Sequence, residues 1–102
     1  MHVANIQIPA NGKWLNLETL ISDKLGSTFT FDSKKTYFLV NDSNSDIFLI
    51  NTDESESTLD NNRVSGVRLS PYGQAGLIKT DGNVYCKSYI NTVADLHIEV
   101  KE

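Results

Sequence analysis

Short runs in which apolar and polar residues alternate recur along this chain, and this period of two constrains its fold more than any other feature. Successive side chains of a β-strand point to opposite faces of a sheet, so such alternation is typical of strands. The regular spacing of the runs favours an all-β domain, an antiparallel β-sandwich of jelly-roll or Ig-like type. The runs are Val3–Ile8, Thr28–Phe31, Val64–Leu69, Ala75–Lys79, Val84–Ser88 and Leu96–Val100.

Two turn sequences predict hairpins. Pro9–Gly12 contains an Asn-Gly pair, which favours positive φ, and it follows the first alternating run. Asp81 and Gly82 form a second turn between two alternating runs, within Leu77–Cys86. We therefore expect a hairpin to start after the first strand, and a tight hairpin to be centred on Asp81 and Gly82.

The register of the second hairpin predicts which side chains are buried. If Val84 and Cys86 face the core, then Tyr85, Lys87 and Tyr89 lie on the opposite face, with their polar tips towards solvent or a partner. Cys86 is the only cysteine of the chain, so no intrachain disulfide is possible. A free cysteine in such a strand is expected to be buried and structural.

One segment competes with the all-β pattern. Apolar residues recur at helical spacing within Leu17–Leu25, Asn16 stands where a helix N-cap would be, and Gly26 stands where a helix would stop. The segment fits either one short helix near residues 17-25 or an irregular loop. The sandwich prediction holds in both cases.

Two further strands are apolar at every position, Tyr37–Val40 and Ile47–Ile50. A two-layer sandwich buries only the inner face of each sheet, so the second apolar face of these strands needs a cover. The cover is either another part of the chain, the segment Asn16–Gly26 or the amino-terminal strand, or a second subunit. This pattern makes a homo-oligomer an open alternative.

Composition and charge limit the class of protein. The 102 residues, 39% apolar and 22% charged, fit a single globular domain over residues 1-102. The net charge is -4 and the nine Lys and Arg residues are scattered, which argues against a nucleic-acid partner. The sequence has no apolar run long enough to span a membrane and no signal-peptide pattern at its start, so we expect a cytosolic product.

The sequence offers little evidence for a catalytic site or a zinc-binding site. His2 stands near a terminus expected to be mobile, and His97 alternates with apolar neighbours on the polar face of a predicted strand. Neither is placed as the base of a nucleophile, and with Cys86 they lack the close spacing of zinc ligands. The acidic run Asp53–Asn62, with Leu59 as its only apolar anchor, reads as a solvated loop. We therefore assign no catalytic, cofactor-binding or metal residue and expect no enzyme.

Two weaker patterns concern ligands. Asp42, Asn44 and Asp46 alternate as in calcium loops, but Ile47 occupies the place of the required glycine. We expect a β-turn whose Asp and Asn side chains satisfy local backbone groups, with a peripheral metal as the alternative. Aromatic residues could line a sugar- or partner-binding face, with core packing as the alternative for Trp14. The candidates are Trp14, Tyr72, Tyr85 and Tyr89.

From Lys13 onwards a series of short motifs follows a characteristic order. The motifs are Trp14–Leu17, Phe29-Thr30, Lys35–Asn41, Gly66–Pro71, Gly82–Ser88 and Leu96–Val100. In this order of motifs the chain resembles small bacteriophage virion proteins of the capsid decoration or head-fibre type. It departs from their pattern at Asp53–Asn62, where a shorter turn containing Pro or Gly is typical.

The resemblance implies a structural protein without catalytic residues that assembles with itself, often as a homotrimer, on a virion. Its partners would be further copies and other virion proteins such as the major capsid protein, and it would be made in the host cytoplasm. One alternative stays open, a β-sandwich module that recognises a carbohydrate or a receptor.

Overall fold

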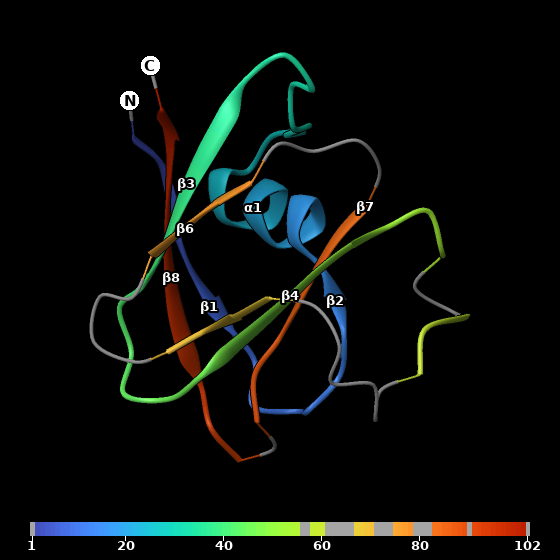
Figure 1. The fold of residues 1–102 in the computed structure, drawn as a ribbon, viewed down its shortest axis with the longest axis vertical. Coiled ribbons are helices and arrows are strands. Elements are labelled where there is room, and N and C mark those ends of the chain that lie inside the picture. The colour runs from blue at the N-terminus through green and yellow to red at the C-terminus, as the bar shows by residue number, and fades with distance from the viewer. Residues whose placement is uncertain are drawn as a thin grey trace.

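The computed structural model describes residues 2–55, 58–60, 67–70, 75–78, 83–89 and 91–101, and in this part of the chain it shows two four-stranded antiparallel sheets and one helix, α1 (Leu17–Leu25). Sheet A contains, in spatial order, β1 (His2–Ile8), β8 (Ala94–Lys101), β3 (Thr36–Asn41) and β6 (Ala75–Ile78). Sheet B contains β2 (Leu15–Asn16), β7 (Asn83–Lys87), β4 (Ile47–Thr52) and β5 (Val67–Leu69). The prediction of an all-β sandwich is confirmed (Figure 1).

The pairing of strands is that of a jelly roll. β1 pairs with β8, β2 with β7, β3 with β6 and β4 with β5, so the chain runs like one long hairpin whose two arms are wrapped into two sheets. The remaining pairs, β3 with β8 and β4 with β7, complete the two sheets. Of the two sandwich types that the sequence left open, the jelly roll matches this order.

The two predicted hairpins are therefore wrong. β1 pairs with β8, and after a turn at Ala10 and Asn11 the chain crosses to β2 in sheet B. β6 and β7 lie in different sheets, while Asp81 and Gly82 themselves are outside the described residues. Alternation fixes which face of a strand is buried, but it does not fix which strand lies beside it.

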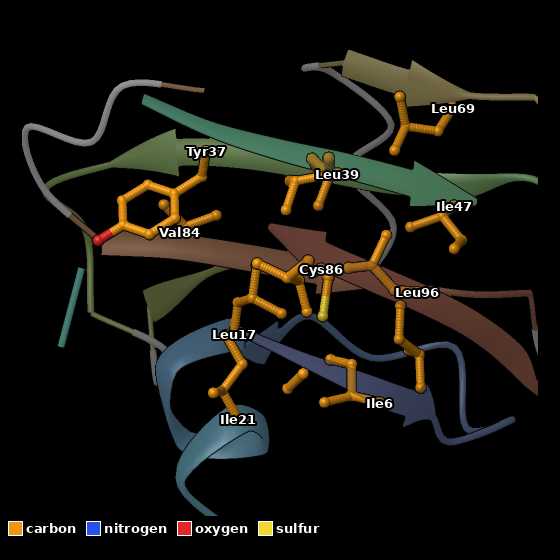
Figure 2. Close-up of a cluster of buried hydrophobic side chains, with 14 of the residues drawn as sticks. Ile6, Leu17, Ile21, Tyr37, Leu39, Ile47, Leu69, Val84, Cys86 and Leu96 are labelled. Carbon is orange, nitrogen blue, oxygen red and sulfur yellow. The ribbon is translucent and has the colours of Figure 1, made fainter. Parts of the chain in front are cut away.

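The core lies between the sheets and follows the alternation of the sequence. The inward-facing side chains of both sheets are almost completely buried, and Figure 2 shows them converging from opposite layers. Cys86 is fully buried among them, as expected. The members from the strands are Ala4, Ile6, Ile8, Tyr37, Leu39, Ile47, Leu49, Leu69, Val84, Cys86, Ala94, Leu96 and Ile98.

The short helix is confirmed. The Asn16 side chain accepts a hydrogen bond from the Thr19 N–H at 3.2 Å, and Gly26, at φ 72°, donates its N–H to the Ser22 carbonyl at 2.9 Å. These are the N-cap and C-cap that the sequence indicated. Leu17 and Ile21 insert into the core, and α1 packs against β1 and β2, the edge strands of the two sheets. The helix thus closes one side of the sandwich.

Thr28–Phe31 is not a strand, contrary to the sequence pattern. Its backbone bonds to the helix instead, since the Phe29 N–H donates to Ser22 Oγ at 2.8 Å and the Phe31 N–H donates to Glu18 Oε2 at 2.7 Å. The rings of Phe29 and Phe31 pack edge-to-face with each other at 5.1 Å, and Phe31 packs on Tyr37 at 4.7 Å. Side-chain acceptors on α1 therefore replace the ladder that a strand would need.

Candidate binding surfaces

The doubly apolar strand β4 is covered on both faces by its own chain. Its inner face joins the core, and its outer face contributes Phe48 and Ile50 to a second buried cluster with Trp14, Leu59 and Tyr85. The sequence interpretation had offered Asn16–Gly26 or the amino-terminal strand as the cover, and this is wrong for β4. Trp14 and Leu59 come instead from the segment before β2 and from the acidic loop that Leu59 was expected to anchor.

Tyr85 and Lys87 lie in this covered region and not at a free surface. The Tyr85 hydroxyl donates to the Glu54 carbonyl at 2.8 Å, and the Lys87 Nζ lies 5.5 Å from the centre of the Trp14 ring. Both residues are buried, which corrects the expectation that their tips point to solvent or a partner. The reason is that Glu54, Leu59 and Trp14 lie against the outer face of sheet B.

Three of the four aromatic residues predicted to line a binding face lie in the described part of the chain. Of these three, Tyr89 is exposed, with 46% of its surface accessible. Trp14 and Tyr85 are buried, and Tyr72 lies outside the described residues. The Tyr89 ring packs edge-on against Phe48 at 5.4 Å, and its hydroxyl donates to Asp46 Oδ2 at 3.2 Å. Desolvation against its neighbours raises the pKa of the Tyr89 phenol, and the hydrogen bond to Asp46 raises it further.

The second doubly apolar strand, β3, directs one face into the core, and among the described residues no buried cluster includes the apolar side chains of its other face. Tyr37 and Leu39 point into the core, while Phe38 and Val40 point outwards and are half-buried. In the register of sheet A, Phe38 lies opposite Glu99 of β8, and Val40 lies opposite His97. An apolar pair thus stands beside a polar pair on the outer face of this sheet.

His97 lies on the polar face of β8, as expected, and has three neighbours. Its Nδ1 lies 2.6 Å from Asn5 Oδ1, its Nε2 lies 2.7 Å from Glu99 Oε1, and its ring stacks on His2 with centroids 4.9 Å apart. His2, expected at a mobile terminus, belongs to β1 and pairs with Glu99. We call Asn5, Phe38, Val40, His97 and Glu99, together with His2, the outer patch of sheet A.

The carboxylate of Glu99 is the perturbed group of this patch. The hydrogen bond from His97 lowers the pKa of Glu99 and outweighs desolvation, which acts in the opposite direction. The charges of His97, the amino terminus and His2 lower it further. Glu99 therefore remains an anion down to more acidic pH than an ordinary glutamate.

The 42–46 turn is organised by a residue that sequence reasoning missed. Asn41 is fully buried; its Nδ2 donates to the carbonyls of Ser45 at 2.7 Å and Leu69 at 2.9 Å, and its Oδ1 accepts from the Ser43 N–H at 3.0 Å. Within the described residues, no group of three His, Cys, Asp or Glu side chains could hold a metal ion. The parity of β3 was an available signal, because residue 41 falls on the same side of the strand as the buried Tyr37 and Leu39.

An open groove of about 770 Å³ lies between α1 and the ends of β1 and β8. Six of its nine lining residues are polar, three aspartates among them, and it adjoins the outer patch at Asn5. The lining residues are Asn5, Ile6, Gln7, Leu20, Asp23, Lys24, Asp42, Asp95 and Leu96.

No protein-family model, curated protein or solved structure matches this chain. In the part of the chain that the structure describes, α1 is too short and too polar to cross a membrane, and no other segment forms a membrane-spanning helix.

Proposed function

We propose that this chain is a non-enzymatic structural protein of a bacteriophage virion, a small decoration or fibre-attachment domain that self-associates, with a homotrimer as the favoured assembly. The observation that carries the self-association is the half-buried pair Phe38 and Val40, which stands outward on sheet A. Apolar side chains clustered on an outer sheet face are typical of a surface that packs against a partner.

The virion setting is supported by two weaker arguments. The motifs from Lys13 onwards resemble those of small phage virion proteins, and the jelly roll is a fold that viral capsid proteins use. The jelly roll hosts several unrelated functions, so it supports the virion setting by analogy alone. In this setting the partners are further copies of the chain and a major capsid protein.

Under this proposal the two doubly apolar strands have different roles. Phe48 and Ile50 of β4 are buried by the chain's own Trp14 and Leu59, so these side chains stabilise the fold. Phe38 and Val40 of β3, which belong to no buried cluster of the described residues, would pack against a second subunit. Substitution of Phe48 should therefore unfold the protein, whereas substitution of Phe38 should dissociate it.

Size-exclusion chromatography with light scattering, over a concentration series, tests the proposal. We expect a trimer mass for the unchanged protein, and a folded monomer for Phe38→Glu with an unchanged far-ultraviolet circular dichroism spectrum. Asn51→Glu, at an exposed position of β4, is the matched control and should remain assembled. An unchanged protein that is monomeric at every concentration, or a Phe38→Glu variant that stays assembled, would contradict the proposal.

A second candidate is a carbohydrate-recognising module, and Tyr89 is the observation that favours it. An exposed ring held in place by Phe48 and Asp46 offers a flat apolar surface next to a carboxylate that accepts hydrogen bonds. Jelly rolls also occur in lectins. A glycan array probed with the unchanged protein and with Tyr89→Ala decides, because specific binding that Tyr89→Ala abolishes supports the module, and an array without specific signals argues against it.

A further inference from the structure

Each member of the polar pair on the outer patch lies in a row with an outward apolar residue. One row across sheet A contains Asn5, His97 and Val40, and the next contains His2, Glu99 and Phe38. Directly opposite residues of an antiparallel pair have Cβ atoms about 4.5–5.5 Å apart. A subunit that covers Phe38 and Val40 therefore also covers His97 and Glu99.

The hydrogen bonds of His97 differ between its two protonation states. Both ring nitrogens face oxygen acceptors, Asn5 Oδ1 at 2.6 Å and Glu99 Oε1 at 2.7 Å, and only the doubly protonated ring donates to both. A neutral ring has a single N–H. It keeps the contact with Glu99 through Nε2–H if the Asn5 amide turns over and donates to Nδ1.

The net charge of His97 and Glu99 together also differs between the two protonation states of His97. Protonated His97 and ionised Glu99 form a pair without net charge, and their mutual attraction offsets part of the free-energy cost of desolvating them. With neutral His97, the carboxylate of Glu99 keeps one hydrogen bond and a full negative charge. Burying a charge without a partner of opposite sign carries a large free-energy cost.

The other charges that face His97 do not cancel this difference. On β8 the same face carries Asp95 and Lys101, whose charges oppose each other, and on β1 it carries His2 and the amino terminus. From β3 the face presents Thr36, Phe38 and Val40, which bear no charge. Two of these groups are imidazoles, His97 and the exposed His2 that stacks on it, and in the described part of the chain His97 is the one that is hydrogen-bonded to Glu99.

We propose that His97 acts as a protonation switch on the outer patch, so that copies of the chain associate more tightly at mildly acidic pH than at mildly alkaline pH. This rests on the proposed function, because it concerns the same surface and the same partner, a second copy of the chain. Association takes up a proton at the patch, and by linkage a reaction that takes up protons is strengthened as the pH falls. Glu99 remains ionised through this range because His97 holds its pKa low.

Sedimentation velocity at about pH 5.5 and about pH 8 measures the effect, because histidine is the side chain type suited to switching charge between such pH values. For the unchanged protein we expect association at least about fivefold tighter at the lower pH, the lower end of typical coupling between linked equilibria. His97→Gln keeps a polar group of similar reach and should associate equally at both pH values. His2→Gln is the matched control and should retain the dependence.

The outcomes separate the switch from the proposed function. If the unchanged protein is monomeric at both pH values, the proposed function fails and the switch fails with it. If it assembles to the same extent at both pH values, or if His97→Gln keeps the full dependence, the switch alone is wrong. Circular dichroism of each variant at both pH values verifies that the fold is intact, and Glu99→Gln, which removes the charge in question, should abolish the dependence independently of His97.

Discussion

The buried amide of Asn41 hydrogen-bonds the backbone of the 42–46 turn, a role that the sequence pattern assigned to the Asp and Asn side chains of the turn itself. Asp42 and Asn44 are exposed, whereas Asn41 and Ser43 are buried and bonded to each other and to the turn backbone. The Asn41 Nδ2 also reaches the Leu69 carbonyl of β5, so one side chain of sheet A bonds to a strand of sheet B. Alternating acids indicate a turn, but the residue that fixes this turn is the polar one at an inward position.

Asn41→Ala should destabilise the protein by about 2–3 kcal/mol, because it leaves buried carbonyl and N–H groups without partners. Urea unfolding followed by tryptophan fluorescence measures the loss. Asn44→Ala, at the exposed position of the same turn, should change the free energy of unfolding by less than about 0.5 kcal/mol. Equal effects of the two substitutions would show that the Asn41 network does not stabilise the turn.

Among the elements, those with a local signal follow the sequence and those that depend on tertiary contacts do not. Caps at Asn16 and Gly26 marked α1, and alternation marked the strands at either end of the chain. Thr28–Phe31 has the alternation of a strand, but α1 offers it side-chain acceptors and Tyr37 offers an aromatic contact. Alternation cannot predict whether the backbone N–H groups of a segment bond a neighbouring strand or side chains that are distant in the sequence.

The contributions of the two caps of α1 to the stability of the protein should be measurable separately. Asn16→Ala removes the acceptor of the Thr19 N–H and should cost about 1 kcal/mol, which for a domain of this size lowers the melting temperature by about 4–8 °C.

Gly26→Ala should cost a similar amount for a different reason, since no atom lies within 4 Å of the added Cβ and the strain comes from φ 72° alone. Thr19→Ala, an exposed site of the same helix, is the control for calorimetry. A melting temperature unchanged by both cap substitutions would contradict the role assigned to the caps.

At the scale of the whole molecule, the sandwich follows from the alternation, but its topology and its surfaces do not. A period of two gives each strand a buried face, and the jelly-roll order places both apolar faces of β4 under cover, one of them through Trp14 and Leu59. The outer patch was not foreseen, because it joins residues from β1, β3 and β8 whose adjacency depends on that order. No sequence motif links His2, His97 and Glu99, so their proximity could not be predicted from the sequence.

The thiol of Cys86 reports on the integrity of the whole sandwich, since it is fully buried between the two sheets. In native buffer it should react with a thiol reagent at least about a thousandfold more slowly than in the unfolded chain, given a stability of about 5 kcal/mol or more. Tyr89→Cys, which places a thiol at an exposed position, should add one fast-reacting equivalent. Rapid modification of Cys86 in the native protein would mean that the core opens far more readily than its burial implies.

The position of β8 has a consequence for biosynthesis. β8 lies between β1 and β3, so β1 is joined to the rest of sheet A by a strand that is synthesised long after it. Until Ala94–Lys101 have left the ribosome, β1 has no neighbour in its sheet. The pairing of the first strand with the last also gives contacts of long sequence separation, which make folding slow. β1 therefore joins sheet A only after Ala94–Lys101 have been synthesised, and until then it lacks the strand beside which it lies in the folded protein.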